Sequence, residues 1–286
     1  MVKRIINPAP PNLPLGPDTY DRRYQDQFAN VLRLYFNQLK NALGELFSAQ
    51  GGQYLQFPNG AFFQDGVTTL TNSISNVSTA NIVVGSTADF VLPAGGIIIG
   101  SEIITYTGKT PTSFTGITRG AYGSTKAAHT AGAYVSEAQT LASPTVAAPV
   151  ALFKTTSSNQ VSIDTADPTK VFFAVDGIYN IQFSIQMLTF DGTIDNVTIW
   201  FRQNGVDIPY SAGVATVPAI HGGSPGTAII SWNLVQPINA GDYIQLLFAS
   251  DTGNTVAATY PPGTSPTHPA SPSIILTATF VSALYT

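Results

Sequence analysis

The sequence predicts a mainly β protein: an N-terminal arm, a single amphipathic helix, a small β-meander module and a C-terminal antiparallel β-sandwich (jelly roll). Three observations lead to this prediction. Charged residues make up only 10% of the 286 residues, while glycine (25) and proline (20) are abundant, as in structural or extracellular β proteins. One segment near the N-terminus has helical spacing of apolar residues, and the second half alternates apolar and polar residues. We divide the chain into arm plus helix (1–52), a linker with short strands (53–80), β-module (81–140) and jelly roll (145–286).

The arm, "NPAPPNLPLGP", is expected to be extended because proline fixes φ and keeps its predecessor out of the helical region. A helix is expected from Asp18, with Asp18 as N-cap, Asp21 in the first turn and Gly51-Gly52 as the stop. Its apolar seam is spaced 4-3-4-4-3-4 and comprises Tyr24, Phe28, Val31, Tyr35, Leu39, Ala42 and Leu46. Such a helix either packs on its own chain or, as we favour, on copies of itself or a docking surface.

The stretch "GITRGAYGSTKAAHTAGAYV" (116–135) resembles a nucleotide-binding loop at first sight. A phosphate loop, however, needs Gly-x-x-x-x-Gly-Lys-Ser/Thr between a strand and a helix, and here Gly-Ser-Thr-Lys has the reverse order. The residues that follow are too few and too rich in glycine for that helix. Arg119, Lys126 and His129 are therefore interpreted as turn residues or members of a polar network. The surrounding β-module is predicted to contain short strands at 82–84, 97–99 and 103–106.

The same region resembles a module of tail and fibre proteins of tailed bacteriophages. The resemblance lies in "GSEIITYTG", "FTGITRG" and "YGSTKAAHTAGAYV". The segment "PLGPDTYDRRYQDQFANVLRLYFNQL" (14–39) is similar to the arm-plus-helix segments that open small virion proteins of cyanophages. Both resemblances imply a structural protein of a virion rather than an enzymatic activity.

From about Thr145 the chain reads as roughly eight strands. "GIYNIQFSIQML" alternates Tyr179, Ile181, Phe183, Ile185 and Met187, and "NVTIWFRQ" continues the pattern. Asn204-Gly205 predicts a type I′ hairpin, because both of its central residues need positive φ.

Three stretches, "DGIYNIQFSI", "INAGDYIQLLFA" and "ATFVSALY", resemble the trimeric jelly roll of tumour necrosis factor and the complement globular heads. Ser282-Ala283 departs from the usual Ser-Gly of that family. The resemblance implies a homotrimer, with Tyr179, Phe183 and Phe248 near the sandwich core or the trimer interface.

Other function classes find little support. The net charge of −4 gives no basic surface for nucleic acid, and there is no cysteine for thiolate chemistry. We expect neither a signal peptide, a membrane-inserted segment nor a cofactor. His129, His221 and His268 are too scattered for a catalytic triad or a zinc site, and Asp191, Asp195 and Asn196 lack calcium-loop spacing. Paired carboxylates of a glycoside hydrolase remain open from sequence alone, although we expect a non-enzymatic protein.

We therefore expect a homotrimeric tail or fibre protein in the virion, anchored to other virion proteins by its arm and helix. The alternative is a capsid decoration protein that cements the shell, and the number of copies per particle separates the two. Two segments, 211–227 and 251–272, are expected to form exposed loops, which are either ordinary loops of the sandwich or the surface that contacts a glycan of the host. The residues singled out in them are His221, Tyr260 and His268.

Overall fold

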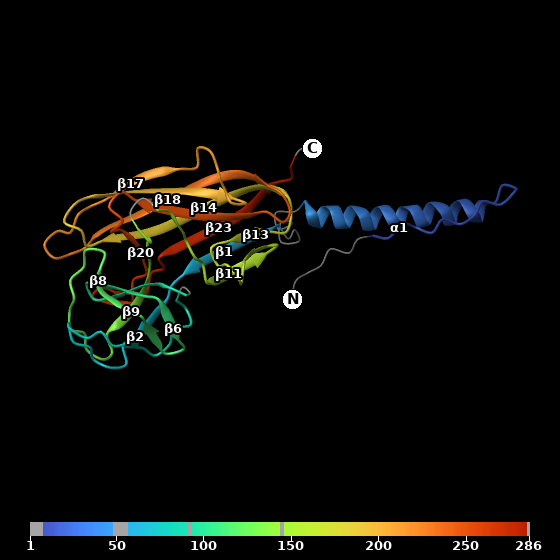
Figure 1. Cartoon of the computed structure of the whole chain (residues 1–286). Helices are drawn as coiled ribbons and strands as arrows, with labels where there is room; N and C mark the ends of the chain where they lie inside the picture. Colours follow the sequence, from blue (N-terminus) through green and yellow to red (C-terminus); the bar gives the residue numbers. More distant parts are fainter. Residues whose placement is uncertain (1–7, 48–56, 91–92, 144–145, 285–286) are drawn as a thin grey trace. The chain divides into compact units, whose positions relative to one another are not determined.

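The computed structural model describes residues 8–47, 57–90, 93–143 and 146–284. The chain divides into two compact units, Met1–Phe57 and Pro58–Thr286. The first contains α1 (Arg22–Leu46), which is the only helix among the described residues, and the second is built from antiparallel strands (Figure 1). The predicted fold class, a mainly β chain with one N-terminal helix, is confirmed.

Helix α1 begins later than predicted. Its N-cap is Asp21, whose carboxylate accepts a hydrogen bond from the backbone N–H of Arg23 at 2.9 Å. Asp18 therefore lies outside the helix, in the preceding turn. The helix ends at Leu46, where Phe47 is the C-cap and its N–H donates to the carbonyl of Leu43. The expected stop at Gly51-Gly52 lies outside the described residues.

The second unit contains a β-sandwich made of two antiparallel sheets. Five strands of the first sheet follow the order β11 (Lys154–Asn159), β1 (Asn59–Gln64), β23 (Ile274–Ser282), β14 (Gly177–Thr189) and β18 (Gly226–Ile238). The second sheet has the order β12 (Val161–Ile163), β13 (Val171–Phe173), β19 (Tyr243–Ser250), β15 (Asp195–Gln203) and β17 (Gly213–Val217). Two short strands, β10 (Ala148–Pro149) and β16 (Val206–Asp207), pair with β19 and β15.

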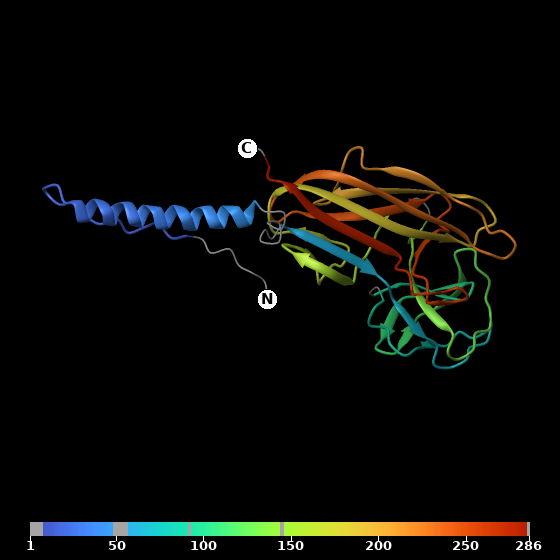
Figure 2. The ribbon, with the colours of Figure 1, turned by 180° about the vertical axis from the view of Figure 1, so that it is seen from behind.

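The order in which the chain visits the two sheets is that of a jelly roll. After β11 it forms β12 and β13 in the second sheet, returns to the first as β14, and continues to alternate until β23. The last strand, β23, lies beside the first strand, β1, as both ribbon views show (Figures 1 and 2). The hairpin at Asn204-Gly205 is confirmed: its φ values are 51° and 82°, and it joins β15 to β16.

The small β-module is an insertion between β1 and β11. Its main sheet contains β2 (Val67–Thr69), β9 (Tyr134–Gln139), β4 (Gly95–Ile99), β5 (Glu102–Tyr106) and β8 (Thr118–Ala121). A second sheet contains β3 (Ile82–Val83), β7 (Ser113–Thr115) and β6 (Gly108–Thr110). The strands expected around 82–84, 97–99 and 103–106 are all present.

The predicted boundaries were wrong in one respect, because residues 57–80 are not a linker. They contribute β1 to the jelly roll and β2 to the module, which therefore begins before residue 81. Strand β1, "NGAFFQ", points Gly60, Phe62 and Gln64 inward, so its buried positions carry only one apolar side chain and the alternation was not visible in the sequence.

The module and the jelly roll share both a sheet and a core. Strand β20 (Val256–Ala258) pairs with β14 of the jelly roll and with β9 of the module, so one sheet runs through both. Each part has its own apolar cluster. A third cluster, which includes Ile98, Leu188 and Phe190, joins the module to the jelly roll. The module is thus an integral part of the second unit rather than a separate spacer.

Candidate interaction surfaces

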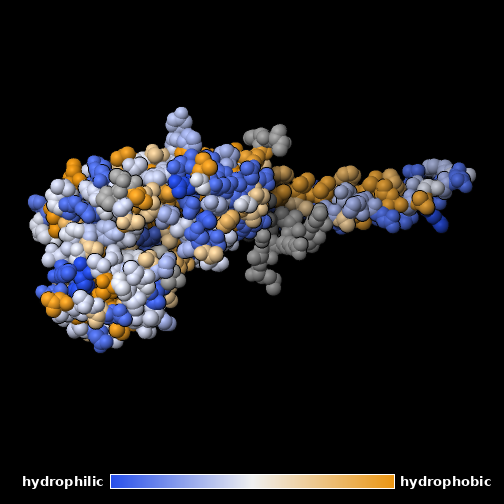
Figure 3. Space-filling view, viewed as in Figure 1, coloured by the Kyte–Doolittle hydropathy of each residue, from blue (hydrophilic) through white to orange (hydrophobic). Residues whose placement is uncertain are grey.

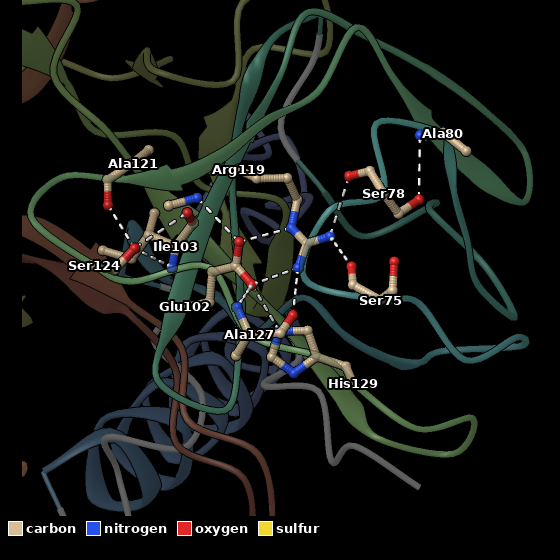
Figure 4. Close-up of polar contacts among 11 residues, drawn as sticks. Ser75, Ser78, Ala80, Glu102, Ile103, Arg119, Ala121, Ser124, Ala127 and His129 are labelled. Carbon is tan, nitrogen blue, oxygen red and sulfur yellow. Dashed lines mark hydrogen bonds and ion pairs between the residues drawn. The ribbon is translucent and has the colours of Figure 1, made fainter.

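The stretch 116–135 forms a closed ion-pair network in the module. Glu102, at the start of β5, is completely buried and faces Arg119 of β8 (Figure 4). Arg119 binds it in a bidentate manner, Nε to Oε1 and Nη2 to Oε2, each at 2.7 Å. The backbone N–H groups of Gly120 and Ala127 also donate to this carboxylate, and Nε2 of His129 lies 2.8 Å from Oε2.

The remaining hydrogen-bonding capacity of Arg119 is used internally. Its guanidinium donates to the backbone carbonyls of Ser75, Ser78 and Ala127, and so ties the segment 75–78 to β8 (Figure 4). Burial alone would raise the pKa of Glu102, but hydrogen bonds from Arg119, Ala127 and His129 outweigh it and lower the pKa to about 2. Arg119 therefore neutralises a buried carboxylate, His129 lies within hydrogen-bonding distance of it, and residues 116–135 contain no helix to receive a phosphate.

The predicted seam on α1 is not covered within the described part of the chain. No residue of α1 is buried, and all seam residues are half-exposed, namely Tyr24, Phe28, Val31, Tyr35, Leu39, Ala42 and Leu46. The arm runs back beside α1 in both ribbon views (Figures 1 and 2), and the hydroxyl of Tyr24 donates to the carbonyl of Pro14 at 3.3 Å. Apolar side chains lie along α1 on the face seen in Figure 3, and Phe36 is 58% exposed.

The outer face of the first jelly-roll sheet is almost free of charge. The five strands β11, β1, β23, β14 and β18 contain a single charged residue, Lys154. Residues opposite one another on this face are neutral: Gln182 lies between Asn233 and Thr277. Several aliphatic side chains lie among them and are exposed to solvent, namely Ile229, Val235, Ile275 and Val281. This surface is called the neutral face below.

The second sheet is bordered by charged residues. Ion pairs lie at the surface between Arg202 of β15 and Asp207 of β16, at 2.7 Å, and between Lys170 and Asp167 in the loop that joins β12 to β13, at 3.1 Å. The carboxylates of Asp242 and Asp251 accept hydrogen bonds from the side chain of Asn204 and from the backbone N–H of Asn196. Most of these charged residues lie in loops, since Arg202 and Asp207 are the surface charged residues of the strands of this sheet.

The three aromatic residues predicted for the core or trimer interface belong to the core of one chain. Tyr179, Phe183 and Phe248 are at most 4% exposed and lie in the jelly-roll cluster. The ring of Phe183 packs edge-on against Phe201 and Trp232, with centroids 5.6 and 4.6 Å apart. Side chains buried in this way are not available to a partner chain, which corrects the interface alternative.

The two segments expected to be host-contact loops are partly strand. β17 lies in 211–227 and β20 in 251–272, and the longest exposed stretches are the tips 221–224 and 264–269. His221 lies in one tip, where its backbone pairs with Ser224, and His268 lies in a hairpin formed by β21 (Gly263–Thr264) and β22 (Thr267–His268). Tyr260 differs from both, because it is half-buried and its hydroxyl is enclosed with no hydrogen-bond partner.

A second buried glutamate, which sequence reasoning did not single out, lies where the module meets the jelly roll. Glu137 of β9 is fully buried, and no ion pair of the described residues involves it. Burial raises its pKa to about 8, against the opposing hydrogen bonds of Gln64 and Ser273, and the nearby Asp65 raises it further. Oε1 of Glu137 and Oε1 of Gln64 are both buried without a donor.

Other kinds of site receive no support from the described residues. They contain no cluster of three or more His, Cys, Asp or Glu side chains that could hold a metal ion. No helix in the described ranges has the length and apolar character needed to cross a membrane. No protein-family model matches this chain, and no curated protein matches it in sequence.

Proposed function

We propose that this chain is a structural protein of a tailed-phage virion, a homotrimeric appendage attached through its N-terminal arm and α1. The jelly roll projects outward and presents the tips around His221 and His268 to the host surface. The sequence features of 14–39 and 100–135 that resemble virion proteins support this proposal, as does the jelly-roll connectivity.

The observation that carries the proposal is the neutral face. A solvated sheet face normally carries charged side chains, and exposed β-branched residues between uncharged polar ones are typical of a surface that a partner covers. Copies of the same chain are the partner that we propose. A flat, uncharged face can meet the edge or face of an identical subunit without burying unpaired charges.

The apolar seam of α1 also supports assembly, because it is not covered within the described residues. An isolated helix of 25 residues gains most of its stability from packing, yet no residue of α1 is buried. The spacing 4-3-4-4-3-4 from Tyr24 to Leu46 is an 11-residue repeat taken twice. An 11-residue repeat favours helices that wind around one another with a right-handed supercoil, in contrast to the left-handed winding of heptads. Three copies of α1 packed along this seam would form the stalk of the appendage.

The first experiment measures the mass in solution of the full-length protein and of residues 58–286 by light scattering. The shorter chain begins at the boundary of the second unit, so that it keeps β1 and the inserted module. Trimers in both cases are the expected result, with the jelly roll as the assembling element. Monomers in both cases would contradict the trimer.

Two threonine variants test which face assembles. Thr279 of β23 lies on the neutral face, and Thr198 of β15 lies on the outer face of the second sheet. Thr279→Lys is expected to convert the trimer to monomers because it places three like charges in the interface, whereas Thr198→Lys leaves the mass unchanged. Dissociation by Thr198→Lys but not by Thr279→Lys would contradict the assignment of the face.

The location is tested by mass spectrometry of purified phage particles from the source of this sequence. The chain is expected among the particle proteins, in tens of copies as for an appendage. Its absence from purified particles would contradict the proposed function, even if the protein is a trimer in solution.

A further inference from the structure

Strand β18 forms one border of the first jelly-roll sheet, beside β14 (Figure 1). It pairs with β14 along all 13 of its residues, Gly226–Ile238, and it pairs with no other strand of the described chain. The register of this pairing contains no shift, so β18 is regular along its whole length. Its second flank is therefore open to a further strand.

Alternate backbone groups of β18 point toward this open flank. The N–H of Gln186 in β14 donates to the carbonyl of Ser273 at 2.8 Å, so the even-numbered residues of β14 turn toward β23 and the odd-numbered ones toward β18. The odd-numbered residues of β14 face even-numbered residues of β18, as Phe183 faces Trp232. The odd-numbered residues of β18 therefore point outward. Pro237 agrees with this assignment, because a proline in a sheet is tolerated where its nitrogen faces outward from an edge.

The outward backbone groups from Thr227 to Val235 make no hydrogen bond to any described residue. Natural proteins usually protect such an edge with a charge, a bulge or a very short strand. The opposite border, β11, has two of these features, namely Lys154 and a shift in its register with β1. β18 contains no charged residue and no shift, and Trp232 and Leu234 are only half-buried along it. The edge of β18 is thus long, regular and unprotected.

The sequence of β18 is symmetric in chemical character about Trp232. The stretch "IISWNLV" (229–235) reads aliphatic, aliphatic, polar, aromatic, polar, aliphatic, aliphatic in both directions. Two antiparallel copies centred on Trp232 place like residues opposite each other, and such cross-strand pairs stabilise a sheet. The facing pairs are Ile229 with Val235, Ile230 with Leu234, Ser231 with Asn233, and Trp232 with itself. Outward residues face outward residues in this register, which is the arrangement that forms pairs of backbone hydrogen bonds.

We propose that β18 pairs antiparallel with β18 of a second copy of this chain, about a twofold axis at Trp232. Self-pairing of one strand requires a twofold axis, so this contact cannot be the one that closes a threefold ring. It joins one assembly to another and does not rest on the proposed trimer. The added strand lies in the plane of the first sheet, so the neutral face stays uncovered. The contact is weak and reversible, because its hydrogen bonds replace bonds to water.

Cysteine pairs test the contact directly, because the chain contains no cysteine of its own. Facing residues of a hydrogen-bonded antiparallel pair have Cα atoms about 5.5 Å apart, within the roughly 4.4–6.8 Å that a disulfide spans. Full-length Ser231→Cys and Asn233→Cys proteins are mixed in equal amounts and oxidised, and the products are identified by intact mass. Nearly all of the disulfide-linked dimer is expected to be the mixed one, whereas random collision would make it half of the product.

The matched control is a mixture of Thr155→Cys and Ser157→Cys. These residues are exposed on β11, two positions apart, at the opposite border of the same sheet. They should give little dimer, in the proportions of random collision. The same random proportions for the β18 variants would overturn the proposal. Efficient dimerisation of Ser231→Cys with itself would also overturn it, because this result indicates that corresponding residues meet around a threefold axis.

A second pair of positions tests the register and the role of the backbone. Mixed Ile229→Cys and Val235→Cys proteins should also form the mixed dimer preferentially. Adding Ser231→Pro to both should abolish it, since the N–H that is removed points outward and is not used by β14. Tryptophan fluorescence during urea unfolding checks that the proline variant is folded. Failure of the 229–235 pair to crosslink would overturn the register. If the protein is a monomer in light scattering, the mixed disulfides are still expected, so failure of the proposed trimer and failure of this contact are distinguishable.

Discussion

Replacing Glu137 with glutamine should make the second unit more stable at neutral pH. Glutamine has nearly the shape of a protonated glutamate, and its amide can donate to Gln64 as a carboxylic acid would. The difference between the two proteins therefore isolates the ionisation of a single buried carboxyl group. Replacing an ionisable residue seldom stabilises a protein, and the stabilisation is expected here because Glu137 is completely buried.

The size of the effect follows from the pKa of Glu137, which burial raises from 4.5 to about 8. Between these values the unfolded chain has lost the proton and the folded protein has kept it, so stability falls as pH rises. Each pH unit costs about 1.4 kcal/mol, which amounts to about 3 kcal/mol at pH 7 and about 5 kcal/mol above pH 8. Because Glu137 is completely buried, solvent does not screen this cost.

Urea unfolding near pH 4.5, 7 and 9 provides the measurement. Both tryptophans, Trp200 and Trp232, lie in the second unit, so their fluorescence follows that unit alone. Wild type and Glu137→Gln should be equally stable near pH 4.5 and diverge as pH rises. Glu45→Gln, exposed on α1, is the control and should show no difference at any pH. A gap between wild type and Glu137→Gln that is the same at all three pH values would refute the reasoning.

Three other substitutions give sharp expectations. Glu102→Gln should destabilise the second unit by about 3 kcal/mol at pH 7, because the pKa of Glu102 in the folded protein is lowered to about 2. The difference in stability from the wild type should vanish as pH falls from 4.5 to 2. A difference that grows as pH falls would contradict this expectation. Phe183→Ala should cost about 3–5 kcal/mol in urea unfolding, since it empties a core site between Phe201 and Trp232; a cost below about 1 kcal/mol would place the side chain outside the core. Gly205→Ala, at φ 82°, should cost about 1 kcal/mol in the same assay, and a stabilising effect would argue against the type I′ hairpin.

The sequence predicted the elements with strong periodicity and missed those whose environment is set by distant segments. The alternation from Tyr179 to Met187 and the Asn204-Gly205 turn are local signals, and both were confirmed. Short strands were expected in 53–80, but the place of β1 in the jelly roll was not, because two of its three inward positions are Gly60 and Gln64. Its assignment depends on β23, which lies more than 200 residues away in the sequence.

The candidate surfaces also include some that the sequence predicted and some that it did not. The seam of α1 was visible as a spacing, whereas the neutral face appears only when five strands are placed side by side. The sequence does show that 177–189 and 226–238 contain no charged residue, which could have indicated such a face. The network of Glu102 could be suspected from the residue types in 102–129, but the burial of Glu137 could not, because it depends on neighbours such as Gln64 and Ser273 that lie far away in the sequence.

The position of the inserted module has a consequence for how such proteins can change. The chain leaves β1 after Gln64, later adds β10 to the second sheet, and reaches β11 at Lys154, the direct partner of Phe63. Residues 65–139 therefore form an excursion between neighbouring strands of the jelly roll. A different domain could replace this excursion without altering the strand order of the jelly roll. The new domain must pair with β20 and cover Leu188 and Phe190. Recombination at this point would give a family of proteins that share one jelly roll and differ in the domain inserted into it.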